Sequence, residues 1–282
     1  MKLAFSTNAY TRYPLTDALI GIKRAGYEAV EILADTPHAY PDLIHDAMTT
    51  SIRRQLDSLG LAVSNVNANC CFGYWRHAPP EPYFEPSLIS PNPQHRADRA
   101  GLIRKTLHFA KNIGAANISI TSGRLLAGMP PDRAARQFAE SIKPLLDEAD
   151  RLNVNIGIEC EPGLFLEFAD ELHHWIGRLN HPRLGANLDI GHSQVLGESI
   201  PAAVNLLADR IWNLHVEDIP GRKHYHLVPG EGTLDWSALF ESLRSIKYDR
   251  YLTVELYTHT ADPQDAAERS YAFLRQALAA RA

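Results

Sequence analysis

The sequence predicts one α/β domain, a closed (β/α)₈ or TIM barrel, and three observations point to this fold. The chain has 282 residues, close to the ~250 of a typical barrel. Eight strand-like runs alternate with helical patterns, at roughly 35 residues per unit. Polar residues end the last four runs, and only closure brings the ends of the fifth to eighth strands near one axis. A doubly wound open sheet has the same alternation but would spread these ends along an edge.

The predicted strands are short apolar runs, and the segments between them have the apolar spacing of helices. Strands are expected near residues 2–6, 28–33, 61–67, 116–121, 154–160, 184–189, 211–216 and 250–256. Helical patterns are clearest over residues 15–25, 47–59, 98–113, 133–152, 165–179 and 236–246. There is no internal repeat, low-complexity linker or glycine-rich nucleotide loop, so we expect a single domain over residues 1–282.

The fifth strand carries the clearest functional signal. Its apolar run starts at Val154, ends in Glu159 and breaks at Pro162, which is typical of a buried parallel strand. Side chains alternate along a strand, so Ile156 and Ile158 point one way and Glu159 points the other. Glu159 is therefore expected at the carboxyl end of a strand, where the active sites of such barrels lie.

The next three strands repeat this arrangement. Aliphatic residues take one parity, and a polar residue of the other parity ends each run: Asp189, His215 and Glu255. With Glu159, they offer three carboxylates and one imidazole to one centre. This donor set suits one divalent ion, Mn²⁺, Mg²⁺, Co²⁺ or Zn²⁺, and leaves positions free for substrate oxygens. One such residue alone would more often be a hydrogen-bonding group, but four inward acids and bases without a cation would repel or stay unpaired.

The longest irregular stretch, residues 70–96, is predicted to be a lid over the barrel mouth. Loops this long are usually functional or disordered in compact domains, and the aromatic residues here argue against disorder. Phe72 and Trp75 are candidates for an apolar wall that sets substrate size. The alternative is a proline-rich loop that covers the outer surface or packs against another subunit, so a homo-oligomer stays open.

The loop after the seventh strand contains a local basic cluster. A phosphate or carboxylate of a substrate could be held there by Arg222, Lys223, His224 and His226, and a solvated loop face is the alternative. The neighbouring Gly-Glu-Gly sequence indicates a turn, with Glu231 as a further candidate for facing the mouth.

The net charge, the hydropathy and the cysteine content limit the kinds of partner that the protein is expected to bind. A net charge of -5 disfavours a general nucleic-acid or anionic-membrane surface, and no run approaches the ~18 apolar residues of a membrane helix. The three cysteines form no zinc spacing and no even-numbered disulfide framework. The first residues have the pattern of a strand rather than of a signal peptide. We therefore expect a cytoplasmic enzyme with a small-molecule, carbohydrate-like substrate.

A set of short motifs extends over nearly the whole chain. They lie at residues 25–32, 99–115, 158–163, 188–192, 214–218, 229–236 and 252–255. The order and spacing of these motifs resemble those of the sugar-phosphate isomerase/epimerase superfamily of xylose isomerase-like barrels. This superfamily includes the ketose 3-epimerases, inosose dehydratase and endonuclease IV.

The resemblance implies roles for particular residues. Glu159, Asp189, His215 and Glu255 match the metal ligands of the family. His192 matches a residue that touches substrate or a further metal, and its alternative role is to orient Asp189.

Residues on the second and third strands indicate which branch of the superfamily the sequence resembles. Glu31 matches a glutamate common in these barrels, and a structural role is at least as well supported as substrate contact. The third strand ends in Asn65 and Asn67 rather than in the extra histidines of the trinuclear zinc nuclease, and 224–226 is His-Tyr-His rather than Asp-x-His. One divalent ion is therefore expected, and DNA cleavage is not.

By resemblance, the predicted activity is isomerisation or epimerisation of a sugar, keto-sugar or polyol derivative through an enediolate-type intermediate. Glu159 and Glu255 would approach opposite faces of the substrate, one removing the proton next to the carbonyl and the other returning it. The alternatives are a dehydratase acting on a keto-cyclitol or similar substrate, a hydrolytic metal site and a non-catalytic carbohydrate-binding barrel.

Overall fold

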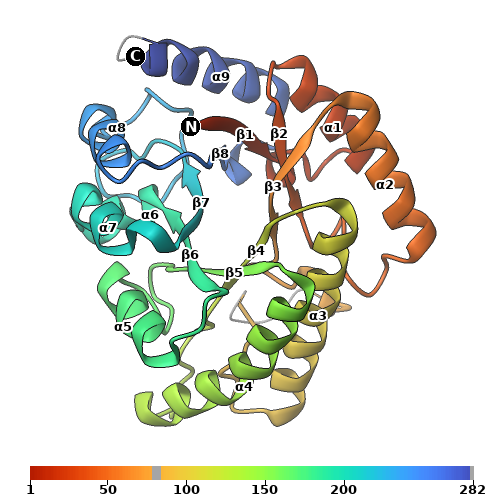
Figure 1. Ribbon diagram of the computed structural model, residues 1–282, viewed down its shortest axis with the longest axis vertical. Helices are drawn as coiled ribbons and strands as arrows, with labels where there is room; N and C mark the ends of the chain where they lie inside the picture. Colours follow the sequence, from red (N-terminus) through yellow and green to blue (C-terminus); the bar gives the residue numbers. More distant parts are fainter. Residues whose placement is uncertain (78–83, 280–282) are drawn as a thin grey trace.

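The computed structural model describes residues 1–77 and 84–279, and it confirms the predicted closed barrel. Eight parallel strands pair in chain order, and β8 pairs with β1 (Figure 1). The strands are β1 (Lys2–Ser6), β2 (Ala29–Leu33), β3 (Ala62–Asn67), β4 (Asn117–Thr121), β5 (Asn155–Glu159), β6 (Leu184–Asp189), β7 (Ile211–Val216) and β8 (Tyr251–Val254). Each lies within one or two residues of its predicted start and end.

Helices surround the strands on the outside (Figure 1). They are α1 (Leu15–Arg24), α2 (Asp46–Leu59), α3 (Pro93–Ile113), α4 (Pro131–Leu152), α5 (Ala169–Leu179), α6 (Ile190–Leu196), α7 (Ile200–Leu207), α8 (Trp236–Ser245) and α9 (Pro263–Ala279). The connection after β6 thus contains two short helices. Among the described residues, no helix combines the length and the apolar character that crossing a membrane requires.

Helix α3 begins five residues earlier than its apolar pattern predicted. The Asn92 side chain accepts a hydrogen bond from the Gln94 N–H at 2.9 Å, and Pro93 occupies the first turn. Both are signals for a helix start, because an Asn cap satisfies a free N–H and proline lacks one. The extra turn shortens the free part of the loop after β3.

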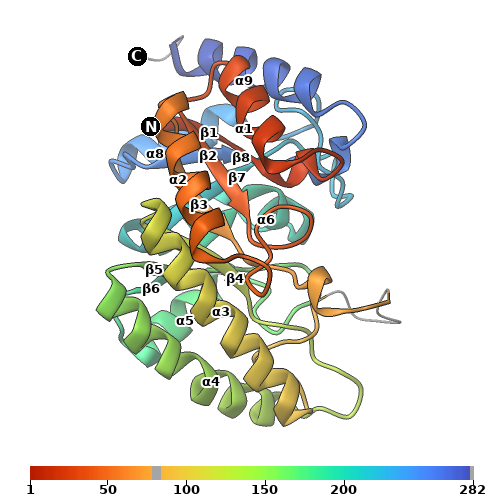
Figure 2. The ribbon, with the colours of Figure 1, turned by 90° about the vertical axis from the view of Figure 1, so that its right-hand side faces the viewer.

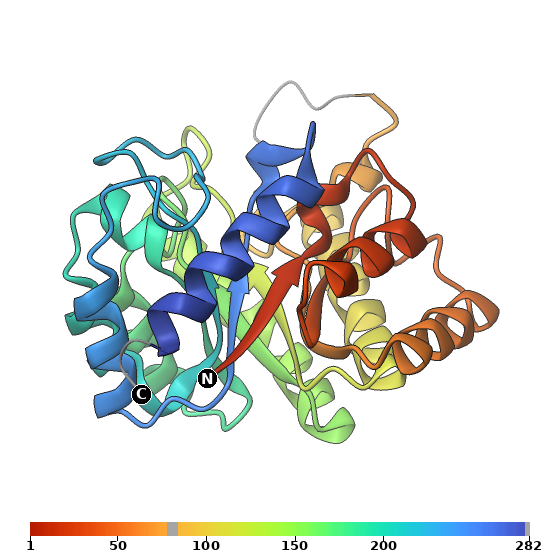
Figure 3. The same cartoon turned by 90° about the horizontal axis from the view of Figure 1, so that it is seen from above.

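Strand register places the polar strand ends at one level. Asp189 on β6 lies opposite His215 on β7, and Glu255 directly follows Val254, which pairs with Val216 of β7. Because all strands are parallel, their carboxyl ends open on one side of the barrel. Figure 2 shows the orange segment after β3 projecting on this side, and Figure 3 shows the loop after β7 there as well.

The apolar core lies between the strands and the helices. Its largest fully buried side chains include Phe5, Tyr27, Phe138 and Phe240. Burial of such rings contributes roughly 1.5–3 kcal/mol each. The strands are thereby held rigidly from outside.

The inside of the barrel is polar instead. The Asn65 amide donates to Glu31 at 2.7 Å, the Asn213 amide donates to Asn187 at 2.8 Å, and the Thr253 hydroxyl donates to Asn213 at 2.8 Å. These buried groups are paired with one another, as buried polar groups must be. A layer of hydrogen-bonded amide and hydroxyl groups inside the barrel therefore supports the acids at the strand ends.

Candidate active site

His215, at the end of β7, is surrounded by the carboxylates of three other strand ends. Its Nδ1 lies 3.0 Å from Glu159 Oε2 and 3.7 Å from Glu255 Oε1. The same nitrogen lies 3.8 Å from Asp189 Oδ2. All four side chains are buried. The four residues expected to share an ion thus converge, and we call them the strand-end centre.

Glu31 on β2 holds the other ring nitrogen of His215, with 2.7 Å between Oε2 and Nε2. Burial alone would raise the pKa of Glu31, but the charge of His215 and its hydrogen bond lower that pKa. Burial disfavours a charged imidazole, yet the surrounding carboxylates, Glu31 first, raise the pKa of His215 well above its ordinary value. Carboxylates behind metal-binding histidines orient the ring in this way. Two roles were predicted for Glu31, a structural role and contact with substrate. Its contact with His215 agrees with the structural role.

Glu255 is fixed by two amides. Its Oε1 accepts hydrogen bonds from Asn8 Nδ2 at 2.9 Å and from Asn67 Nδ2 at 3.1 Å. Burial raises the pKa of Glu255 well above its ordinary value; His215 opposes this shift, and Glu159 adds to it. A carboxyl group with a raised pKa suits general acid–base chemistry.

Asn187 links two members of the centre. Its amide donates to Glu159 Oε2 and lies 3.1 Å from His215 Nδ1. The site predicted from the sequence did not include Asn187, Asn8 or Asn67. For Asn187 a signal was present, because it has the same inward parity as the acid two residues later.

An unpaired atom in the strand-end centre shows how this site fits a cation. Asp189 Oδ1 accepts the His192 N–H at 2.8 Å, whereas Oδ2 is buried with no hydrogen-bond partner among the described residues. Burial would raise the pKa of Asp189, but His192, His226 and His215 together lower it, so the group is a carboxylate. A buried, unpaired carboxylate oxygen is costly unless a cation faces it. The donor set of Glu159, Asp189 and His215 therefore fits a divalent ion.

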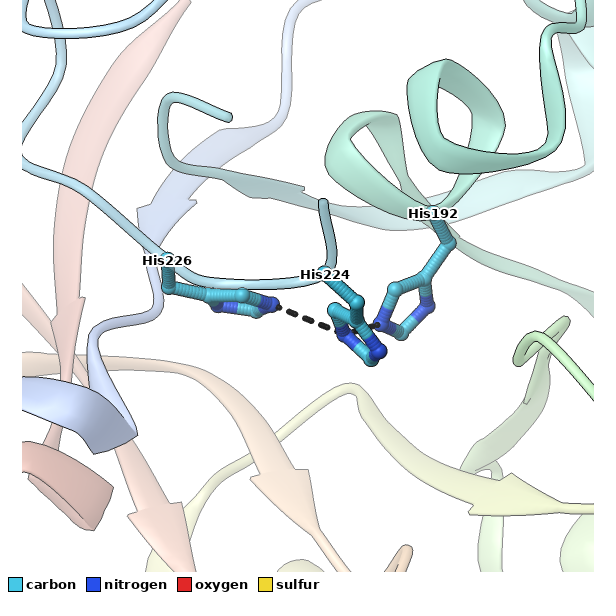
Figure 4. Close-up of side chains that lie close together, drawn as sticks. All are labelled: His192, His224 and His226. Atoms are coloured by element: carbon cyan, nitrogen blue, oxygen red, sulfur yellow. Dashed lines mark hydrogen bonds between the residues drawn. The ribbon is translucent and has the colours of Figure 1, made fainter. Parts of the chain in front are cut away.

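Three histidines form a second group beside this centre, which we call the histidine cluster (Figure 4). His192 comes from α6, and His224 and His226 come from the loop between β7 and α8. His224 Nε2 lies 3.1 Å from His192 Nε2 and 3.4 Å from His226 Nε2. His192 Nε2 is 3.8 Å from Asp189 Oδ2. Two predicted substrate residues, His192 and His226, therefore lie at the edge of the strand-end centre.

The histidines differ in charge. Burial would lower the pKa of His192, but Asp189 and then Glu161 raise it to about 9. Burial lowers the pKa of His226 to about 3. Burial also raises the pKa of Glu161, to about 7, and its Oε2 lies 3.4 Å from His192 Nε2. Glu161, which follows the end of β5 by two residues, thus joins the histidine cluster.

Two predicted substrate residues point elsewhere. Arg222 Nε donates to the Val195 carbonyl at 3.0 Å, near the end of α6. Glu231 is exposed and forms an ion pair with Arg269 of α9. Neither contacts the strand-end centre, because the parity that aims a strand residue does not extend into a loop. Substrate contact by these two residues stays a prediction.

The loop after β3 is anchored at its start. The N–H groups of Phe72 and Gly73 donate to the Asp35 carboxylate at 2.6 and 2.8 Å. Trp75 Nε1 donates to the Glu85 carbonyl at 2.8 Å. Residues 78–83 of the predicted lid lie outside the described residues. Phe72 exposes 45% of its surface, and its role and that of Trp75 in contacting substrate remain predictions.

Asp218 ties the loop after β7 to the start of α8. Its Oδ1 accepts the N–H groups of Ile219 and Leu234, both at 3.0 Å. Its Oδ2 accepts the Gly230 N–H at 2.9 Å and the Trp236 Nε1–H at 3.0 Å. Asp218 thus organises the loop that carries two histidines of the cluster.

Comparisons with known proteins agree with this architecture. A family model described as a xylose isomerase-like TIM barrel matches residues 21–277. Fructoselysine 3-epimerase of Escherichia coli O157:H7 is 25% identical over 263 residues, which cover 92% of this chain and 91% of that protein. The crystal structure of a D-tagatose 3-epimerase-like protein superposes with a TM-score of 0.83 at 19% identity, over 99% of this chain and 97% of that one. An IOLI protein with a zinc atom bound gives a TM-score of 0.79 at 16% identity over 98% of both chains.

Proposed function

The chain belongs to the xylose isomerase-like TIM-barrel family, and we propose that it is a divalent-metal-dependent sugar epimerase acting on a ketose or related keto-sugar. One observation carries the proposal: two carboxylates, Glu159 and Glu255, reach one imidazole from separate strands of the barrel. The resemblance to a fructoselysine 3-epimerase supports inversion of the carbon next to the ketose carbonyl.

The two carboxylates supply the proton transfers. Glu159 comes from β5 and Glu255 follows β8, and β6 and β7 lie between them. A substrate between the two meets one acid on each face. In one direction Glu159 removes the proton next to the carbonyl and Glu255 returns a proton to the other face; in the reverse direction the roles exchange. Return to the opposite face inverts the carbon.

Glu159, Asp189, His215 and Glu255 would hold the ion. When bound, a divalent ion supplies Lewis-acid stabilisation of the negative charge that develops on the substrate's carbonyl oxygen. Glu31 accepts the Nε2 proton of His215 and so aims Nδ1 of this ring at the centre.

Residues at the mouth would bind the rest of the sugar. His192 and His226 lie beside the centre and offer ring nitrogens to hydroxyl groups. Phe72 and Trp75, anchored through Asp35 and the Glu85 carbonyl, would close over the substrate and exclude water. Exclusion of water strengthens the basicity of a carboxylate, because it removes the hydration of its charge.

The test is incubation of the metal-loaded protein with a panel of ketoses in D₂O, followed by NMR and mass spectrometry. An epimer with deuterium at the inverted carbon is the expected product. An aldose would indicate an isomerase, and loss of water would indicate the dehydratase alternative. Sugar binding with neither turnover nor exchange would contradict catalysis and point to the carbohydrate-binding barrel.

A further inference from the structure

Asn8 carries a buried hydrogen-bond acceptor that no group in the described part of the chain satisfies. The residue follows β1 by two positions and exposes 7% of its surface, and its Oδ1 has no hydrogen-bond partner there. A buried acceptor without a donor is costly, and each such atom in a folded protein calls for an explanation. Asp189 Oδ2, the atom that fits a cation, is in the same state. A donor on a bound molecule would satisfy the oxygen of Asn8.

The contact with Glu255 fixes which end of the Asn8 amide is free. Glu255 Oε1 accepts a hydrogen bond from Asn8 Nδ2 at 2.9 Å and a second one from Asn67 Nδ2 at 3.1 Å. Only the nitrogen of an amide donates, so Nδ2 faces Glu255 and Oδ1 is the free atom. The two atoms are attached to the same carbon. Oδ1 therefore lies directly beside the carboxyl group to which we assign a proton transfer.

Asn67 makes the same contact with Glu255 but keeps no free acceptor. Its Nδ2 also lies 3.3 Å from Glu31 Oε1, and its Oδ1 accepts the N–H of Asn69 at 3.1 Å. Two amides thus support one carboxyl group, and both ends of the Asn67 amide are engaged within the chain. Support of Glu255 explains the nitrogen of Asn8 but leaves its oxygen without a role.

The turn that carries Asn8 is held in place. The Asn8 N–H donates to the Ser6 hydroxyl at 3.3 Å, at the start of the short 3-10 helix η1 (Thr7–Tyr10). The Thr7 hydroxyl accepts the Leu33 N–H at 2.9 Å, which ties this turn to the end of β2. A fixed acceptor loses little conformational entropy when a ligand binds. Asn8 is therefore suited to selecting a donor at one position.

The donors that a keto-sugar brings are its hydroxyl groups. In a 2-ketose the carbonyl carbon is C2 and the inverted carbon is C3. In the proposed reaction the carbonyl oxygen lies at the strand-end centre, and Glu255 meets C3. The hydroxyl group on C4, the next carbon, is then the nearest one beyond the reacting atoms. It is the donor that an acceptor beside Glu255 would meet first.

We propose that Asn8 determines substrate specificity, with its Oδ1 accepting a hydrogen bond from the C4 hydroxyl group of the sugar. This inference rests on the proposed function, because that function places C3 beside Glu255. The substrate class is then 2-ketoses with a free hydroxyl group on C4. Ketoses that lack this group, or that carry a glycosidic bond there, leave the acceptor buried and unpaired and should be poor substrates.

Kinetics with a deoxy sugar test the proposal. For a ketose that the wild-type protein turns over, kcat/KM is expected to be roughly 10–100-fold lower for its 4-deoxy analogue. In Asn8→Ala the two sugars should differ by less than about threefold, because the acceptor is gone. The 6-deoxy analogue is the control sugar, and its kcat/KM relative to the parent ketose should be the same in both proteins.

Asn67→Ala is the matched control variant. It also removes an N–H from Glu255 Oε1 and should lower kcat, but it leaves Oδ1 of Asn8 in place, so the preference for the 4-hydroxy sugar should persist. If Asn8 only positions Glu255, Asn8→Ala will lower kcat and keep that preference, which would overturn the proposal. Equal kcat/KM of the wild type for both sugars would overturn it as well, even if Asn8→Ala does not fold.

Calorimetric binding separates failure of this inference from failure of the proposed function. Should no ketose be epimerised, the proposed function fails, and the affinities of wild type and Asn8→Ala for a ketose and its 4-deoxy analogue test Asn8 alone. The 4-deoxy sugar is expected to bind more weakly than its parent to the wild type and equally well to the variant. Equal affinities in the wild type, or no binding of either sugar, would refute the role of Asn8.

Discussion

The strand-end centre and the histidine cluster lie on either side of Asp189, yet they differ in donors and in support. Asp189 Oδ2 is 3.8 Å from a nitrogen of His215 on one side and 3.8 Å from a nitrogen of His192 on the other. The centre sets carboxylates around one buried imidazole on strands. The cluster sets imidazoles beside one carboxylate on a helix and a loop. The two regions therefore offer different donors, mainly oxygen atoms in the centre and mainly nitrogen atoms in the cluster.

The two regions also differ in how firmly they are held. His215 is fully buried between carboxylates, whereas the His224 side chain is 29% exposed. Substitutions in the centre should therefore damage the reaction itself, and substitutions around the cluster should act through substrate binding or through the loop.

Loss of one acid–base carboxylate should have the largest effect. Glu255→Gln is expected to lower kcat for epimerisation about 10³-fold, because an amide cannot exchange a proton with the substrate carbon. Steady-state assays at saturating metal measure this. The control Glu140→Gln, on the exposed face of α4, should leave the rate unchanged. Wild-type turnover by Glu255→Gln would refute the role given to Glu255.

Removal of Asp218 should loosen the loop that carries His224 and His226. Asp218→Ala leaves four N–H donors without their acceptor, which is expected to lower the free energy of unfolding by about 2–4 kcal/mol. Urea denaturation measures the change. Asp209→Ala, whose side chain is 90% exposed, is the control and should alter stability by under about 0.5 kcal/mol.

Neutralising Glu31 should weaken metal binding at the strand-end centre alone. Glu31→Gln keeps the shape of the side chain but loses the charge behind His215, and such changes lower metal affinity roughly 10–100-fold. Competition with a chelator measures affinity for Mn²⁺. Equal Mn²⁺ affinity in Glu31→Gln and in the exposed control Glu28→Gln would contradict the role of Glu31.

Arg222 should matter least if its contacts in the structure persist with substrate bound. Arg222→Ala is expected to change kcat/KM by less than about threefold for an uncharged ketose, because the guanidinium caps the end of α6 and does not face the centre. A loss greater than tenfold confined to phosphorylated or carboxylated sugars would instead restore the predicted anion-binding role.

Residues on strands could be predicted well because two regularities act there together. The alternation of side chains along a strand shows which residues point into the barrel, and the parallel register shows how far along the barrel axis they lie. Together they allowed Glu159, Asp189 and His215 to be placed beside one another from their positions in the strands. The polar inner layer was missed because an asparagine in a strand looks like a weak strand residue until its neighbours are known. Asn187 and Asn213 are examples.

Residues beyond the strand ends could not be placed in this way. Arg222 and Glu231 lie in the loop after β7, whose path is set by the four hydrogen bonds of Asp218 rather than by any period. The same loop brings His224 beside His192 across 32 residues of chain. Spacing alone does not predict such a contact, since it depends on where the loop turns back.

Deuterium exchange by the metal-saturated Glu255→Gln variant tests the central claim most directly. Wild-type protein and variant, each with its metal content measured, are incubated with a turned-over ketose in D₂O, and deuterium at the carbon next to the carbonyl is followed by NMR. The account predicts deuterium in the wild-type epimer and none in the epimer pool of the variant. Epimerisation without solvent deuterium in the wild type, or formation of deuterated epimer by the variant at the wild-type rate, would contradict it.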